Sequence, residues 1–130
     1  MSSRSVRTLV LLDAFYMAVG HAPLIRAIFF SFQIGAFFLF STLIYVIGGI
    51  LVICGGKLFR LANVGLILMA IIDNILLVYT RTMPNIFFSR VIPWSSHWVP
   101  VPGTIQIFFG QAIIVVLCCV LLLNTKDAIN

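Results

Sequence analysis

The sequence predicts an all-α protein, a single-domain bundle of four membrane-spanning helices over residues 1–130. Composition is the first reason, since 62% of the residues are hydrophobic and only 8% are charged, whereas a soluble domain carries about 25% charged residues. So few charges cannot cover a surface exposed to water. The second reason is that the apolar residues form four runs, each near or above the roughly 20 residues that cross a bilayer as a helix. These observations exclude an ordinary soluble enzyme, a nucleic-acid-binding domain and a disordered chain.

The first predicted span covers residues 6–24 and ends near Pro23. Because Asp13 interrupts its apolar core, we interpret it as a retained helix rather than a removable signal peptide. The second predicted span, residues 27–54, is long enough to tilt or to continue beyond the hydrocarbon. Gly55-Gly56 closes it.

The third predicted span covers residues 58–79 and contains Asp73-Asn74, and the fourth covers residues 104–123. The connection between them, residues 80–103, is rich in proline and tryptophan. Proline prevents regular helix, and tryptophan favours the depth of the lipid headgroups. We therefore expect an irregular loop at the membrane surface.

Four spans place both termini on the same side of the membrane. The basic residues expected on that side are Arg4, Arg7, Lys57, Arg60 and Lys126. Those expected on the other side are Arg26, Arg81 and Arg90. This excess predicts a multi-pass protein with cytoplasmic N- and C-termini. Because the basic residues stand singly at span ends, without a stripe of interleaved aromatics, we expect no nucleic-acid partner.

The two halves of the chain resemble each other. The segments that recur in the same order are 11–14 with 71–74, 27–31 with 85–89, and 32–34 with 105–107. Repeated helix pairs occur in transporters, while chance similarity is the alternative, since apolar helices draw on few residue types. Under a duplication, Asp13 and Asp73 occupy equivalent depths.

Asp13 and Asp73 are the two acidic residues predicted to lie inside the bilayer. A charged residue at the centre of a lipid-exposed helix costs about 2.5–3.5 kcal/mol, so both must face protein or water. One interpretation is a proton or cation relay, completed by the polar residues Asn74, Gln33, Gln106 and Gln111.

The other interpretation is a clamp between helices, in which an aspartate pairs with His21, Arg26, Asn or Gln across an interface. We favour the clamp because no span carries the series of acids expected of a pump. Two stripes of small residues at every fourth position also predict close helix packing. They are Ala14, Ala18 and Ala22 in the first span, and Ala27, Ser31 and Gly35 at the start of the second.

His21 and His97 are weak candidates for metal ligands, and we expect no metal site. Two histidines do not supply the three protein ligands of a usual catalytic zinc site, and their spacing matches no metal motif. No C-x-x-C occurs among Cys54, Cys118 and Cys119, so these thiols are interpreted as inert residues in apolar surroundings. The sequence identifies no cofactor.

Catalytic motifs such as G-x-S-x-G, H-E-x-x-H and a phosphate-binding glycine loop do not occur. We therefore expect a protein that is not catalytic by itself, an accessory subunit of a larger membrane complex, for instance a respiratory or membrane-oxidase complex. Its expected partners are the lipid bilayer and other membrane subunits or copies of itself. The main alternative is a small homo-oligomeric ion or solute transporter that uses Asp13 and Asp73. A third is a membrane enzyme with a metal bound through His21 or His97.

Overall fold

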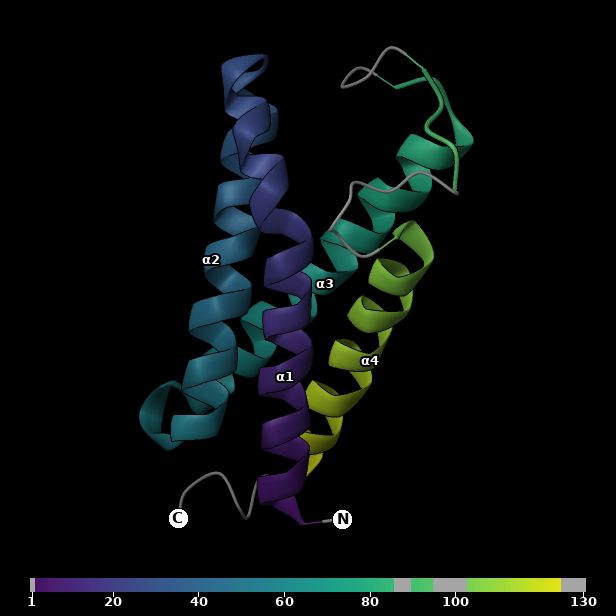
Figure 1. Ribbon diagram of the computed structural model, residues 1–130. Helices are drawn as coiled ribbons and strands as arrows, with labels where there is room; N and C mark the ends of the chain where they lie inside the picture. The colour runs from purple at the N-terminus through teal and green to yellow at the C-terminus, as the bar shows by residue number, and fades with distance from the viewer. Residues whose placement is uncertain (1, 86–89, 95–102, 125–130) are drawn as a thin grey trace.

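The computed structural model describes residues 2–85, 90–94 and 103–124. Every regular element in these ranges is helical (Figure 1). The α-helices are α1 (Ser3–His21), α2 (Phe32–Cys54), α3 (Phe59–Thr82) and α4 (Thr104–Leu123). Two 3-10 segments complete the fold, namely η1 (Ala22–Phe29) between α1 and α2, and η2 (Gly56–Leu58) before α3.

Four stretches of the described chain are long and apolar enough to cross a membrane. They are Ser3–Phe29, Phe32–Cys54, Gly56–Thr82 and Thr104–Leu123. Large hydrophobic side chains also lie exposed along all four α-helices, as expected where lipid is the solvent. The predicted all-helical class is confirmed, and the four stretches indicate a multi-pass membrane protein.

The helix boundaries differ from the predicted spans mainly in the connection between α1 and α2. The second span was predicted to begin at Ala27, whereas the structure places Ala27 in η1 and begins α2 at Phe32. Pro23 lies in the first turn of η1. Because proline has no N–H to donate, it disfavours continuation of the regular α-helix there. The C-terminal end of α3 also differs, because the helix continues to Thr82 rather than ending at residue 79.

The helices form two antiparallel pairs, α1 with α2 and α3 with α4, and further contacts of α1 with α4 and α2 with α3 join the pairs. We call the end where α1 begins and α4 finishes the terminal end, and the opposite end the loop end. The two pairs diverge toward the loop end (Figure 1). There η1 continues the chain beyond α1 and packs mainly against α2 (Figure 1).

The turn from α2 to α3 lies at the terminal end (Figure 1). Gly55 and Gly56 have φ angles of 70° and 77°, which L side chains rarely adopt. The predicted closure of the second span by these two glycines is therefore explained by the backbone. Beside the turn, the Arg7 guanidinium lies over the Phe59 ring, 4.5 Å from its centroid.

Glycine and alanine permit the close contacts between the helices. A Cβ atom at Gly49 of α2 would lie 3.1 Å from the Cβ of Ala14 on α1. A Cβ atom at Gly35 would overlap the backbone of Ile28 in η1. Substitution at either position therefore requires one element to move away from the other.

The two predicted stripes of small residues are only partly at helix contacts. In the first stripe Ala14 and Ala18 are buried, whereas Ala22 is exposed. In the second, Gly35 is buried, while Ala27 and Ser31 are half-buried. The difference arises because the α-helix ends at His21, so the four-residue spacing no longer keeps later residues on one face.

Candidate functional site

Asp73 lies deep in the bundle. It follows Phe59, the first residue of α3, by 14 positions, or about 21 Å of helix. The residue is 4% exposed. A carboxylate at such a position must be compensated by hydrogen bonds or by an opposite charge.

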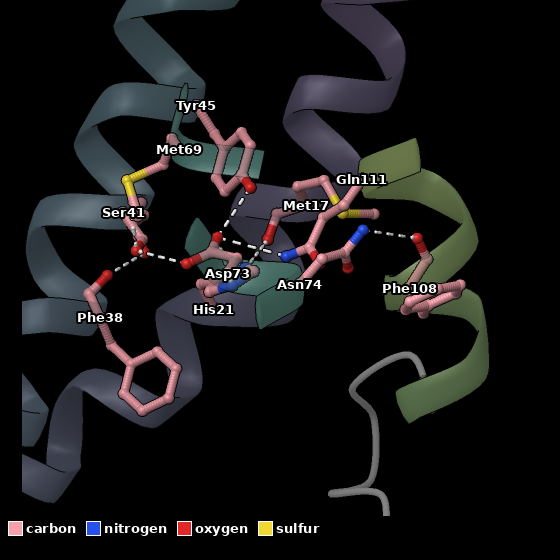
Figure 2. A network of polar contacts seen from close by, with 11 residues as sticks. Met17, His21, Phe38, Ser41, Tyr45, Met69, Asp73, Asn74, Phe108 and Gln111 are labelled. Atoms are coloured by element: carbon pink, nitrogen blue, oxygen red, sulfur yellow. Dashed lines mark hydrogen bonds and ion pairs between the residues drawn. The ribbon is translucent and has the colours of Figure 1, made fainter. Parts of the chain in front are cut away.

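The compensation comes from the other three α-helices (Figure 2). The Tyr45 hydroxyl on α2 donates to Asp73 Oδ2 over 2.7 Å, and Gln111 Nε2 on α4 donates to the same oxygen over 3.2 Å. His21 Nε2 on α1 lies 3.1 Å from Oδ2. Ser41 on α2 donates to Oδ1 over 3.3 Å. We call these five residues the Asp73 network, and it joins all four α-helices.

Regular spacing along each helix brings these residues together. Ser41 and Tyr45 are four residues apart on α2, so they share a face. On α3 the same spacing places Met69 beside Asp73, and the Met69 sulfur lies 3.8 Å from the Ser41 hydroxyl. The polar residues therefore form one compact layer within the apolar interior.

His21 is the last residue of α1 and is held on several sides. Its Nδ1 lies 2.7 Å from the carbonyl oxygen of Met17, one turn earlier. Its ring centroid lies 5.3 Å from that of Tyr45 and 5.9 Å from that of Phe38. These contacts fix the ring so that Nε2 points to Asp73 (Figure 2).

The other predicted polar residues lie outside the network. Asn74 donates to the carbonyl oxygen of Phe108 over 3.4 Å, and its own buried Oδ1 has no hydrogen-bond partner among the described residues. Gln33 and Gln106 are exposed near the first turns of α2 and α4. The structure therefore does not bring these two glutamines to either acid.

Asp13 has a different environment from Asp73. It is half-buried on α1, and within the described part of the chain its side chain has no hydrogen bond, with Oδ2 buried. The carboxylate lies beside Gly110 of α4, where an added Cβ would be 3.2 Å from Oδ1. Asp13 precedes His21 by eight residues, about 12 Å. Asp13 is therefore not part of the hydrogen-bonded Asp73 network.

The described residues contain no group of three or more His, Cys, Asp or Glu side chains placed to hold a metal ion. His21 is already bound to Met17 and Asp73, and His97 lies outside the described residues. Cys118 is buried, whereas Cys54 and Cys119 are exposed, and none of these three cysteines forms a disulfide.

Sequence reasoning did not single out Ser41 and Tyr45. The available signal was weak: two polar residues at four-residue spacing inside an apolar run. Only knowledge of which face of α2 meets α3 makes them partners of Asp73. Gln111 was named among several polar residues, without a reason to prefer it.

Comparison with protein-family models, with curated proteins and with solved structures finds no match.

Proposed function

We propose that the protein is a non-catalytic accessory subunit of a larger membrane complex, in which its helices fill and stabilise interfaces. The observation that carries this proposal is Asp13, an acid inside a membrane span that has no hydrogen-bond partner among the described residues.

The depth of Asp13 makes the missing partner significant. Asp13 follows Ser3 by ten residues, about 15 Å along a helix of 19 residues. It therefore lies near the middle of α1. A carboxylate at that depth without a hydrogen-bond partner is costly, whether it faces lipid or the interior of the bundle. A hydrogen-bond donor or a basic side chain from another membrane helix would remove this cost.

The Asp73 network supports a structural role rather than a substrate site. Both carboxylate oxygens accept hydrogen bonds from the chain itself, and Oδ2 has three donor groups around it. The residues of the network are buried. Such an arrangement joins four helices into one unit, and this supports the interpretation of Asp73 as a clamp between helices.

The test is purification in a mild detergent, followed by identification of the chains that migrate with the protein. We expect larger membrane subunits to co-purify. Asp13→Asn should weaken their retention by roughly five- to thirty-fold, the equivalent of about 1–2 kcal/mol. Asp127→Asn, the same chemical change outside the spans, serves as the matched control. A protein that runs alone as a small oligomer would contradict the proposal.

A second candidate is a homo-oligomeric transporter of protons or small cations. The specific observation in its favour is the buried pair of His21 and Asp73, two ionisable groups 3.1 Å apart within the spans. In this case the purified protein alone should move ions across liposome membranes. Asp73→Asn should stop the flux while the oligomer stays intact. Absence of flux from correctly assembled protein would rule this candidate out.

We also propose that both termini lie in the cytoplasm and that the two halves of the chain arose by duplication of a two-helix unit. Arg4, Arg7, Lys57 and Arg60 lie near the terminal end, which favours cytoplasmic termini. Protection of an N-terminal epitope tag from protease added to intact cells tests this orientation.

The two antiparallel helix pairs support a duplicated two-helix unit. The different environments of Asp13 and Asp73 then reflect divergence of the halves.

A further inference from the structure

The hydrogen bond at His21 Nδ1 fixes one proton of the imidazole ring. Nδ1 lies 2.7 Å from the carbonyl oxygen of Met17. A backbone carbonyl oxygen only accepts hydrogen bonds, so Nδ1 must carry hydrogen and donate. In a neutral imidazole the other nitrogen, Nε2, would then be a bare acceptor.

Nε2, however, lies 3.1 Å from Asp73 Oδ2. An ionised carboxylate is also only an acceptor, and two acceptors at this separation repel each other unless a proton lies between them. The pair of His21 and Asp73 must therefore hold one proton in addition to that on Nδ1.

The surroundings of Asp73 decide which atom carries this proton. Tyr45 and Gln111 both donate to Oδ2, and Ser41 donates to Oδ1. Hydrogen bonds donated to a carboxylate favour its ionised form. We propose that the His21–Asp73 pair is a proton-binding site inside the bundle, with the bound proton on His21 Nε2.

The same surroundings select a proton over a metal ion. A metal ion requires several oxygen or nitrogen acceptors directed at it. The groups that surround this carboxylate instead present donors, namely a phenol, an amide NH2, a hydroxyl and the imidazole N–H. Metal ligation would require most of them to turn away from Asp73.

The charged residues nearest to the pair along the chain are Asp13 on α1, Arg26 on η1 and Arg81 on α3. Tyr45 on α2 and Gln111 on α4 contact Asp73 directly. Arg81 lies eight residues beyond Asp73, about 12 Å, and donates to Thr80 and Thr104. With the proton, the pair is neutral overall. Loss of the proton to water leaves a net negative charge within the bundle.

The position of His21 gives the proton a structural consequence. His21 ends α1 and directly precedes η1. The α1–α2 and α3–α4 pairs diverge toward the loop end, the end toward which α1 runs (Figure 1). The bond from Nε2 to Asp73 ties α1 to α3 across these pairs. Loss of the proton removes this bond, so occupancy of the site controls how firmly the loop ends of the pairs are joined.

Nitrogen-15 NMR of histidine-labelled protein in lipid nanodiscs tests the proposal. The His97→Ala background leaves His21 as the single histidine. At neutral pH we expect signals of a ring with hydrogen on both nitrogens. A ring without hydrogen on Nε2 at neutral pH would overturn the proposal.

Two substitutions assign the effect to the pair. Asp73→Asn should yield the single-hydrogen form at neutral pH, whereas Asp13→Asn should leave both hydrogens on the ring. An unchanged ring in folded Asp73→Asn protein would contradict the assignment. If Asp73→Asn does not fold, the measurement on the His97→Ala background remains decisive by itself.

Discussion

Replacement of Asp73 by asparagine probes the structural role of the network. The substitution keeps the size of the side chain but replaces one acceptor oxygen with an NH2 group. In the native bundle four donor groups converge on the carboxylate. Since asparagine retains a single acceptor oxygen, some of these donors lose their partner and others face a new donor.

The expected magnitude follows from those four contacts. A polar contact between membrane helices contributes about 0.6 kcal/mol on average and about 1.7 kcal/mol at most. Four contacts then contribute about 2.4 kcal/mol, with an upper bound of about 7 kcal/mol. Loss of roughly half of them, with a further penalty for donors left buried without an acceptor, predicts a destabilisation of about 2–4 kcal/mol.

Asp13→Asn is a matched control, because it makes the same chemical change at an acid that forms no hydrogen bond within the described residues. Unfolding is measured by far-UV circular dichroism as the SDS fraction of mixed micelles is raised. The free energy of unfolding of the isolated chain should fall for Asp73→Asn and stay within about 0.5 kcal/mol for Asp13→Asn. Equal effects of the two substitutions would refute the structural role of the network.

Two further predictions use the same unfolding assay. Tyr45→Phe removes the hydroxyl that donates to Asp73 over 2.7 Å but keeps the buried ring, so it should cost about 1 kcal/mol; an unchanged stability would show that this bond contributes nothing. Gly35→Ala should destabilise the bundle by more than 1 kcal/mol, since the added methyl overlaps the Ile28 backbone. Gly65→Ala should be neutral or stabilising, because no neighbouring atom lies within 4 Å of the added carbon and alanine favours helix. An equal effect of the two alanines would contradict the close contact of α2 with η1.

The class of protein and its long helices could be predicted from composition and from the length of each apolar run, since these depend on the sum of many residues. The end of α1 at His21 was harder to predict, because it depends on how a short segment around Pro23 packs against α2. Residues 27–31 are as apolar as the span that follows them. Hydropathy alone therefore could not separate η1 from α2.

The candidate site was predicted in part. The cost of an acid in lipid identified Asp73 and the need for a partner, and His21 was among the partners considered. Tyr45 and Ser41 were missed because a hydroxyl in an apolar run has no distinctive pattern. The choice of Asp73 rather than Asp13 as the centre of a network depends on helix rotation and register. These are set by packing, with Gly49 against Ala14 as one determinant.

The central claim is that His21 and Asp73 act together to join α1 to α3. A double-mutant cycle with His21→Phe and Asp73→Asn measures this directly, because phenylalanine keeps an aromatic ring beside Tyr45 but has no nitrogen. The free energies of unfolding of the two single variants and of the double variant should reveal a coupling of about 1–3 kcal/mol. Effects that add to within about 0.5 kcal/mol would contradict the claim.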